Sequence, residues 1–548
     1  MNKIKIKIKN RIELEVDSHL TLLEISKQFK NDYKFDIIAG QIDSEIVSLN
    51  QVVTKDCAVD FYDRSTLDGY VIYEKTLHFI LIAAVKRVCG SSAELVIEHS
   101  IDKGFYCEIK DHIMTNKLAI EISNAMQAII DEDIVIKKVN IARLDAISYF
   151  KIKNQLDKVN LLKYISNTYI NLYLLDGIYD YFFTELAYST KSINSFLLTY
   201  IDEHGFVVSL PTIYNPSVTS PYVHHKLLFD AFMKYTLWGR SLAITNVSDF
   251  NHIIATGNYD NFVKLAENYF EEQLSELADK IDANRQNIKM VLIAGPSSSG
   301  KTTTAKKLEI FLNNHNIKTH QISIDNYFVN RVDTPKDEFG EYDYECVESI
   351  DLKTFNEDMA KLLAKEEVLI PEYNFITGQR EYNGKRLKMN DSDVIIIEGL
   401  HALNSVMSSS IKKENKMKVY ISPLTHLNID NHNRIHTSDL RRLRRIVRDN
   451  KFRGYQAGDT LRMWEKIKAG EEKYIFPFQD DADFIINSAL VYEIGVLKVY
   501  AEPLLFTVAE DDSMYHEAKR LINFLRNFLP IPSEVVPKDS ILREFVGK

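Results

Sequence analysis

An octapeptide in the second half of the chain restricts the possible folds more than any other feature. Gly295-Pro-Ser-Ser-Ser-Gly-Lys301-Thr302 fits the phosphate-loop pattern G-x-x-x-x-G-K-[ST]. The apolar run from Lys289 to Ala294 before it predicts a buried parallel strand, and the segment after it has the apolar spacing of a helix. The loop is therefore expected at a helix N-terminus, where backbone N–H groups and the helix dipole attract phosphate.

Side chains of this loop would hold a nucleoside triphosphate and a cation. Lys301 is expected to reach the outer phosphates, and the hydroxyl of Thr302 to bind Mg²⁺. The residues predicted to contact the nucleotide are Gly295, Pro296, Ser297, Ser298, Ser299, Gly300, Lys301, Thr302 and Thr303.

Length and composition indicate a large globular protein. A chain of 548 residues exceeds one hydrophobic core, which predicts about three or four domains. With 45% hydrophobic and 26% charged residues the composition is ordinary, and no apolar run approaches the ~18 residues of a membrane span. The N-terminal alternation of lysine and isoleucine predicts a strand and not a secretory signal, so we expect a cytoplasmic protein without membrane contact.

Cysteine content and charge restrict metals and partners. The four cysteines are scattered without C-x-x-C spacing, which argues against a disulfide framework or a structural zinc site. The net charge of −10 gives no general affinity for polyanions, so contact with RNA would need a local basic patch. The N-terminal lysine run is interpreted as one solvated strand face in preference to such a patch.

The sequence of residues 1–62 predicts a strand, a helix and two further strands. After the lysine run, a helix is expected from a cap at Ser18 to Phe29, followed by strands at Asp36–Ile42 and Ala58–Tyr62. In pattern and length this region resembles the β-grasp TGS domain, named for threonyl-tRNA synthetase, GTPases and a stringent-response enzyme.

Residues 63–210 begin with a helix from Tyr73 to Val88 and continue into a strand that ends in Gly104-Phe-Tyr. This stretch resembles the second additional domain of threonyl-tRNA synthetase, an α+β editing domain. In that family the helix carries an H-x-x-x-H zinc pair, whereas the matching positions here are Lys75 and Phe79, with His78 between them. The resemblance therefore implies an editing-like fold that has lost its metal motif, with a structural His78.

Two further acids follow apolar strands in the second half. Lys318–Ile324 predicts a second strand that ends in Asp325, and Ser392–Ile397 a third that ends in Glu398. Ligands gather at the carboxyl ends of strands in a doubly wound parallel sheet. We expect Asp325 to accept an alcohol proton and Glu398 to help hold Mg²⁺, in preference to roles as loop or capping carboxylates.

Two more segments carry candidate substrate and phosphate contacts. The stretch Leu369–Arg380 contains aromatic residues that either stack on a ring or belong to the core. The stretch Asp439–Gly454 contains six arginines, which suit the charge of a transferring phosphoryl group. A basic solvated helix or an RNA-facing patch is the alternative for that stretch.

Residues 288–500 together resemble the uridine kinase and phosphoribulokinase family of P-loop kinases. The matching motifs are the loop, Asp325–Phe328, Pro371–Phe375, Glu398-Gly399, Arg444–Gly454 and Ala482–Asn487. The resemblance implies ATP and Mg²⁺ as cofactors and Asp325 as the general base. It implies catalytic roles for Lys301, Arg445, Arg448 and Arg453, the arginines on a closing lid, and acceptor contacts by Tyr327, Glu345, Tyr373, Phe375 and Arg380.

Two departures weaken the assignment of the acceptor. Uridine kinases carry an aspartate followed by His-Pro at the ribose, where this chain has Glu345 and no His-Pro. They also have a base-contacting histidine where this chain has Gly378. A polar contact worth about 1–3 kcal/mol is lost if its partner stays buried and unpaired.

The sequence thus predicts a multidomain α/β and α+β protein in which a loop and helical connector (211–287) precedes the doubly wound parallel-sheet kinase domain (288–500) and a C-terminal helical extension (501–548). We expect a kinase that transfers the γ-phosphoryl group of ATP to the 5′-hydroxyl of uridine or a related nucleoside. The alternatives are a tRNA- or ribosome-associated nucleotide-sensing ATPase, with RNA contact through the N-terminal domains, and a kinase of a non-nucleoside alcohol. A homo-oligomer is expected.

Overall fold

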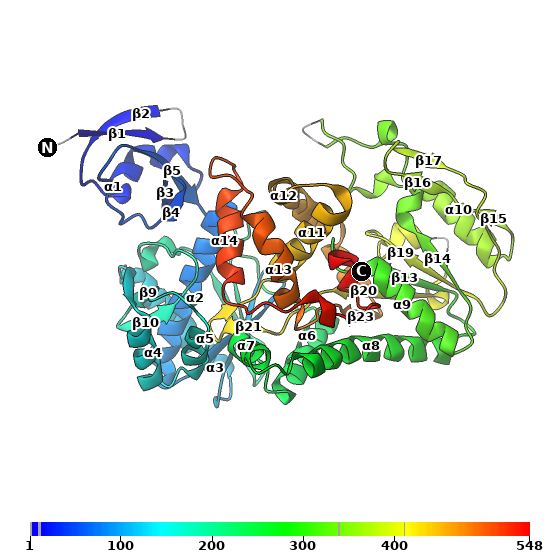
Figure 1. The fold of residues 1–548 in the computed structure, drawn as a ribbon, viewed down its shortest axis with the longest axis horizontal. Helices are drawn as coiled ribbons and strands as arrows, with labels where there is room; N and C mark the ends of the chain where they lie inside the picture. Colours follow the sequence, from blue (N-terminus) through cyan, green and yellow to red (C-terminus); the bar gives the residue numbers. More distant parts are fainter. Residues whose placement is uncertain (1–2, 9–11, 338–339, 410, 548) are drawn as a thin grey trace.

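The computed structural model describes residues 3–8, 12–337, 340–409 and 411–547. Figure 1 shows two small N-terminal domains on one side and a parallel sheet with its helices on the other, with long helix α8 running beneath the sheet. Within the described residues, no helix is long and apolar enough to cross a membrane.

The first domain is a β-grasp sheet of order β2-β1-β5-β3-β4, in which β1 and β5 are parallel. Each lysine of β1 faces an acid on β2, and the isoleucines between them are buried, which confirms the lysine run as one solvated strand face. The strands are β1 (Lys3–Ile8), β2 (Ile12–Asp17), β3 (Ile37–Ile42), β4 (Glu45–Val47) and β5 (Cys57–Asp63).

The expected helix begins later than predicted, and Ser18 does not cap it. Helix α1 spans Leu22–Ser26 and is capped by Thr21, whose Oγ1 accepts from the Glu24 N–H at 3.2 Å. The Thr21 N–H in turn donates to Glu24 Oε2 at 2.8 Å. Thr21 rather than Ser18 has a glutamate three residues later, so only Thr21 forms this reciprocal capping box.

The second domain surrounds one buried helix, α2 (Leu67–Cys89). Its antiparallel sheets have the orders β10-β9-β8 and β11-β12-β7-β6. The strands are β6 (Leu95–Ile101), β7 (Gly104–Ile109), β8 (Lys137–Ala142), β9 (Tyr169–Leu175), β10 (Ile178–Tyr181), β11 (Leu197–Tyr200) and β12 (Gly205–Ser209), with helices α3 (Asn116–Asp131), α4 (Arg143–Ile152) and α5 (Leu156–Lys163).

The side chains at the positions that match the zinc pair lie in the core of this domain. Lys75 and Phe79 are almost fully buried, as is His78, whose ring centroid lies 4.4 Å from that of Phe105. Burial lowers the pKa of His78 well below its usual value. A neutral imidazole packed edge-on against a phenyl ring is a structural element of the core.

Three helices make up most of the connector: α6 (Lys226–Ser241), α7 (Val247–Ala255) and α8 (Tyr259–Ala283). The apolar face of α8, with Leu274, Leu277 and Ile281, shares one hydrophobic core with Val291 and Ile293 of the parallel sheet. The core of the kinase-like domain therefore begins before residue 288.

The parallel sheet has the order β14-β19-β13-β20-β23, and helices cover both faces. Its strands are β13 (Met290–Ala294), β14 (Thr319–Ser323), β19 (Val394–Glu398), β20 (Lys416–Ser422) and β23 (Phe484–Asn487). The helices are α9 (Lys301–Asn314), α10 (Leu352–Leu363), α11 (Thr437–Arg453), α12 (Ala457–Tyr474) and α13 (Glu493–Leu505), and the short strands are β15 (Val368–Leu369), β16 (Glu372–Asn374), β17 (Gln379–Glu381) and β18 (Arg386–Leu387).

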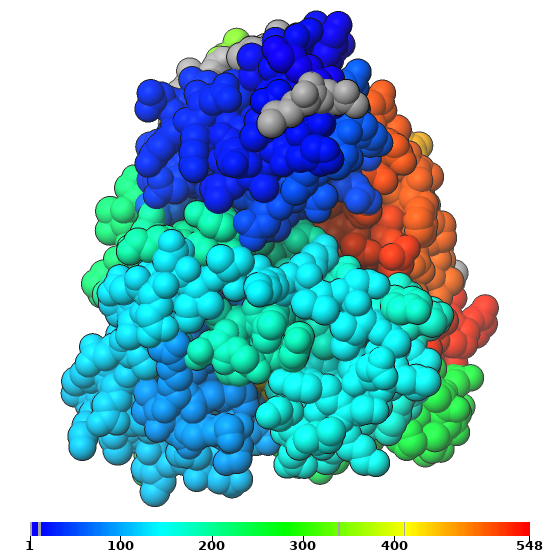
Figure 2. All heavy atoms as spheres, turned by 90° about the vertical axis from the view of Figure 1, so that its left-hand side faces the viewer, coloured from blue at the N-terminus to red at the C-terminus, as the bar shows by residue number. Residues whose placement is uncertain are grey.

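The C-terminal helices α14 (Tyr515–Leu525) and α15 (Arg543–Val546) pack into the same core as the sheet. Helix α14 also reaches the first domain, since Lys519 Nζ donates to Glu45 Oε1 at 2.7 Å. Figure 2 shows the first domain (blue) above the second (cyan), with the C-terminal helices (orange to red) beside them.

A hairpin between β20 and α11 ties the kinase-like domain to the second domain. It consists of β21 (Asn428–Asp430) and β22 (Asn433–Arg434). The Ile97 N–H donates to Asn431 O at 2.8 Å, and Arg434 donates to Glu74 of α2 at 2.9 Å. Both Arg434 and Glu74 are buried, and the guanidinium helps to lower the pKa of Glu74 against the effect of burial.

Arg434→Met should destabilise the whole chain, because it leaves the Glu74 carboxylate buried without its guanidinium partner. We expect a loss of about 3 kcal/mol and a fall of the thermal midpoint by about 3 °C. The matched control is Arg386→Met. The ion pair of Arg386 with Glu367 is exposed, so its loss should lower the free energy of unfolding by less than about 0.5 kcal/mol. Equal melting of the two variants, measured by circular dichroism, would contradict this account of the hairpin.

Candidate active site

The phosphate loop connects β13 to α9 in the conformation that its glycines permit. Gly300 has a φ of 88° at the N-cap of α9, and Ser298 has a φ of 61°. Lys301 Nζ donates back to the carbonyls of Gly295 at 2.9 Å and Pro296 at 3.3 Å. The loop thus stands at the start of a 14-residue helix, as the octapeptide predicted.

Both predicted strand-end acids lie at the carboxyl edge of the sheet beside this loop. Asp325 follows β14 in a 3₁₀ turn, and Glu398 ends β19 opposite Ser323 and Ile293. Burial and the Glu398 charge raise the pKa of Asp325 to about 6, although Lys301 and Arg453 oppose the shift. A carboxyl group with this pKa is largely ionised at neutral pH and is suited to accept a proton.

Glu345 joins this cluster from a loop between β14 and α10. Its side chain lies against Gly470 of α12, where an added Cβ would be 2.9 Å from the Glu345 Cβ. Burial and the neighbouring Glu471 raise the pKa of Glu345 to about 7, and Arg445 and Lys301 lower it. The structure therefore brings Glu345 near the lysine of the phosphate loop.

The three predicted lid arginines converge on one buried carboxylate, Asp449. Arg445 Nε, an Arg448 terminal nitrogen and an Arg453 terminal nitrogen lie 3.0, 3.1 and 3.4 Å from its oxygens. Arg445 also donates to Ser297 Oγ at 2.6 Å, so it contacts the phosphate loop directly. In this arrangement the Asp449 carboxylate offsets part of the positive charge of Arg448 and Arg453.

Three residues for which the sequence predicted no individual role shape the loop. Arg441 donates to Ser297 O at 2.8 Å, and Arg444 donates to Ser298 O at 3.3 Å. Glu471 accepts the Ser297 N–H at 2.8 Å and pairs with Arg441. Nothing local distinguishes Glu471 from the other acids of α12, and only the packing of α12 against α11 selects it.

The predicted acceptor residues do not all line the site. Tyr327 is fully buried, its ring meets Phe355 at 5.1 Å, and its hydroxyl donates to Asp358 at 3.2 Å. This corrects the prediction for Tyr327, whose ring is part of the core under α10. The reason is the 3₁₀ turn, which directs this side chain inward two residues after Asp325.

The remaining aromatic candidates lie on the β16–β17 hairpin. Tyr373 packs edge-on against Phe328, next to the turn that carries Asp325, with ring centroids 5.5 Å apart. Phe375 is 61% exposed, which leaves its ring free to stack on a ligand. Arg380, opposite Tyr373 on the hairpin, donates to Asp351 at 2.8 Å.

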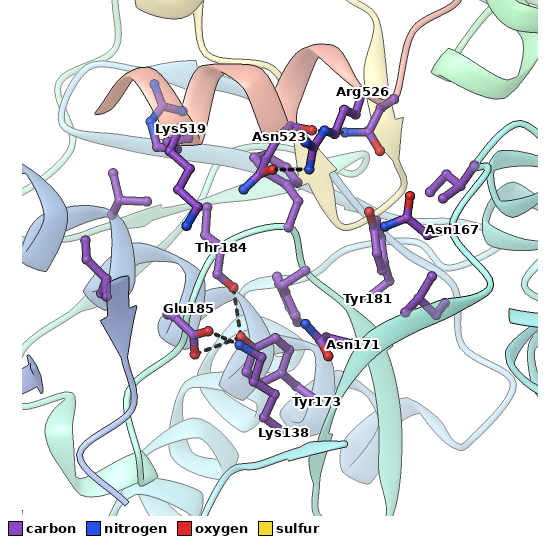
Figure 3. A pocket seen from close by; sticks show the side chains of 18 of the residues that line it. Lys138, Asn167, Asn171, Tyr173, Tyr181, Thr184, Glu185, Lys519, Asn523 and Arg526 are labelled. Atoms are coloured by element: carbon purple, nitrogen blue, oxygen red, sulfur yellow. Dashed lines mark hydrogen bonds and ion pairs between the residues drawn. The ribbon is translucent and has the colours of Figure 1, made fainter. Parts of the chain in front are cut away.

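A cavity of about 960 Å³ lies elsewhere, between the N-terminal domains and α14 (Figure 3). Figure 3 shows Lys519, Asn523 and Arg526 on one side and Tyr173, Thr184 and Glu185 on the other. Most of its cations already have partners: Lys519 pairs with Glu45, Lys138 with Glu185, and Lys498 donates to two carbonyls. This cavity contains none of the predicted site residues.

Comparison with known proteins relates the two halves to different families. Residues 290–494 match the sequence model of the Phosphoribulokinase / Uridine kinase family. The chain is similar to the uridine kinase of Lactobacillus helveticus, with 25% identity over 195 residues that cover 35% of this chain and 83% of that protein. In its N-terminal region it is similar to the threonine–tRNA ligase of Clostridium kluyveri, with 31% identity over 161 residues, 29% of this chain and 25% of the ligase.

Among solved structures, a possible uridine kinase from Bacillus stearothermophilus aligns with 20% identity and a TM-score of 0.27, over 40% of this chain and 98% of that one. The chain spans about a quarter of the length of the threonine–tRNA ligases that it matches. Residues 290–494 thus form a domain of the phosphoribulokinase and uridine kinase family, which confirms the family that the motifs predicted. In this chain a synthetase-like region precedes that P-loop kinase domain.

Glu345→Gln should remove a pH dependence of stability. The folded-state pKa of Glu345, about 7, lies above its ordinary value of 4.5, so its proton stabilises the fold at low pH and this contribution is lost as pH rises to about 7. Each pKa unit corresponds to about 1.4 kcal/mol, so the variant should gain on the order of 3 kcal/mol over the wild type between pH 4.5 and 8. Urea unfolding across this range measures the difference.

The control for this change is Glu348→Gln, which neutralises an exposed glutamate three residues away. Its unfolding free energy should follow the wild-type pH curve. Parallel curves for Glu345→Gln and the wild type would mean that Glu345 is solvated.

Proposed function

We propose that this chain is an ATP-dependent kinase that transfers the γ-phosphoryl group to the 5′-hydroxyl of uridine or a related nucleoside. The observation that carries the proposal is the position of Asp325 and Glu398 at the carboxyl edge of the sheet, both acting electrostatically on Lys301 of the phosphate loop. A loop for phosphate and an ionised acid for an alcohol proton are the two elements that phosphoryl transfer to an alcohol needs.

In this proposal the basic groups bind phosphate and an acidic group accepts the proton. The N–H groups of the loop and Lys301 hold the phosphates of ATP, and Asp325 accepts the proton of the attacking hydroxyl. Arg445, which already contacts Ser297, is the arginine best situated to neutralise charge on the transferring group. Arg448 and Arg453, which pair with Asp449 in the structure, would exchange that carboxylate for phosphate oxygens.

The oxygen donors near the loop fit Mg²⁺. The side chains of Thr302 and Glu398 make no hydrogen bond within the described residues, so their oxygens are available to a hard cation. Within those residues no group of three or more histidine, cysteine or acidic side chains is arranged to hold a metal. Mg²⁺ in kinases takes few protein ligands and completes its shell with phosphate oxygens, where it neutralises their charge.

The acceptor pocket carries its own polar groups in place of the usual ones. Glu345 supplies a carboxylate suited to ribose hydroxyls. At Gly378, where uridine kinases have a histidine, the Arg331 side chain lies so close that a Cβ would be 2.8–3.0 Å from its atoms. Arg331 can therefore donate to an acceptor base at that side of the hairpin.

A panel of acceptors tests the proposal. With ATP and Mg²⁺, the purified protein should form the monophosphate of at least one ribonucleoside, identified by mass spectrometry. It should prefer this ribonucleoside over the 2′-deoxy form, because the Glu345 carboxylate is proposed to accept hydrogen bonds from both ribose hydroxyls. A sugar and pantothenate are the non-nucleoside acceptors in the panel. Phosphorylation of one of these alone would show that the acceptor is a different alcohol. A protein that binds ATP and phosphorylates no acceptor would refute the kinase proposal.

Asp325→Asn should lower kcat by about 100-fold or more and leave ATP affinity within about threefold, because only the proton acceptor is lost. In the wild type, kcat/KM should fall as pH drops below about 6, where Asp325 becomes protonated. The residual rate of the variant should lack this limb. Asp333→Asn, at an exposed aspartate nearby, is the control and should keep the wild-type pH profile.

The second candidate is a nucleotide-sensing ATPase that acts on tRNA or the ribosome. The similarity of the N-terminal region to threonine–tRNA ligase favours it. The lysines of β1 do not favour it, because each lies opposite an acidic residue of β2. ATP hydrolysis that increases with RNA and not with nucleosides would support this candidate, and a homo-oligomer stays a prediction.

A further inference from the structure

The last residues of the chain pack onto the phosphate loop. Residues 540–547, named here the C-terminal segment, include α15 and lie between α9 and α11 (Figure 1). Ile541, Leu542, Phe545 and Val546 are each no more than 1% exposed. The C-terminal segment is therefore a packed element of the kinase domain.

Two contacts of the segment reach residues predicted to bind the nucleotide. Thr303 Oγ1 donates to Glu544 Oε2 at 2.6 Å. Ile541 lies so close to Gly300 that a Cβ on this glycine would be 2.3 Å from the Ile541 Cδ1. Gly300 is the N-cap of α9 and Thr303 lies in its first turn. The segment thus contacts the end of the helix at which a phosphate would bind.

Basic groups around the loop hold the segment in place. The Arg444 guanidinium, which also donates to Ser298 O, lies 5.0 Å from the ring centroid of Phe545. Lys451 donates to Val546 O, and Lys307 of α9 pairs at 3.2 Å with Asp539 directly before the segment. These contacts join the segment to both sides of the nucleotide site.

Glu544 and a phosphate group would compete for this place. The N-terminus of α9 favours an anion, and the Glu544 carboxylate provides one. Its charge is also felt by Lys301, whose amine is expected to reach the outer phosphates of ATP. Two anions at one poorly solvated helix end repel strongly, so a bound triphosphate would disfavour the docked segment.

We propose that the C-terminal segment is an autoinhibitory element that competes with ATP, with Glu544 as the carboxylate that takes the place of a phosphate. This rests on the nucleotide binding of the proposed function. The apparent affinity for ATP is then reduced by the fraction of molecules in which the segment is docked.

The test is ATP binding by full-length Glu544→Gln, measured by isothermal titration calorimetry with Mg²⁺. Glutamine keeps an oxygen that accepts from Thr303 and loses the charge, so the fold should be retained and ATP should bind about tenfold more tightly. Glu534→Gln is the control: Glu534 is exposed, makes no ion pair or hydrogen bond through its side chain within the described residues, and its change should alter the Kd by less than about twofold. Unchanged or weaker binding by Glu544→Gln would overturn the proposal, since weaker binding is the result expected if Glu544 holds the nucleotide.

Hydrogen exchange of the wild-type chain gives a second measurement that needs no variant. Addition of ATP with Mg²⁺ should slow exchange in the phosphate loop and accelerate it in residues 540–547. Slower exchange in both segments would overturn autoinhibition and make the segment a wall of the ATP site. Neither readout requires phosphoryl transfer, so a failed acceptor panel leaves the inference standing, whereas no ATP binding by wild type and variant would overturn both proposals.

Discussion

The buried charge pairs of α11 are the interactions on which the rest of the kinase domain depends. Arg444 is fully buried, bonds Glu493 at 2.6 and 2.9 Å, and still donates to carbonyls of the phosphate loop and of Ser488. Arg441 links Glu471 to the carbonyl of Ser297. Removal of ions from water costs several kcal/mol each, which is recovered only when every donor finds an acceptor. The shape of the loop is therefore set by a helix that lies more than a hundred residues further along the chain.

Residues at and just before the start of the same helix are also bound to other parts of the chain. Asp439, in its first turn, accepts two hydrogen bonds from Arg520 of α14, and Arg434, just before the helix, is held by Glu74 of α2. The arginine-bearing helix cannot move without affecting these buried pairs. This gives the N-terminal half a physical role in the fold, and Lys75 and Phe79, at the positions that match the synthetase zinc pair, are buried.

Local signals predicted the parts of the site that lie close together in sequence or at the ends of strands. The phosphate loop is a contiguous motif, and Asp325 and Glu398 follow strands whose apolar runs place them at one edge of the sheet. The β-grasp strand with alternating lysines follows from a two-residue period. Two predictions from the sequence were wrong. Ser18 does not cap α1, because Thr21 forms the capping box, and the Tyr327 side chain is buried, because the 3₁₀ turn after β14 directs it inward.

By itself, therefore, the sequence determined the kinase family, the phosphate loop, the two strand-end acids and the arginine-rich stretch at 439–454, because each is encoded by periodicity or short spacing. Only the tertiary structure decided which carboxylate each arginine meets, that Glu471 and Glu544 lie on the phosphate loop, and that α8 and α15 belong to the kinase core. These contacts join segments separated by tens to hundreds of residues. Side chains of one charge type look alike in a sequence, and burial in the folded chain selects among them.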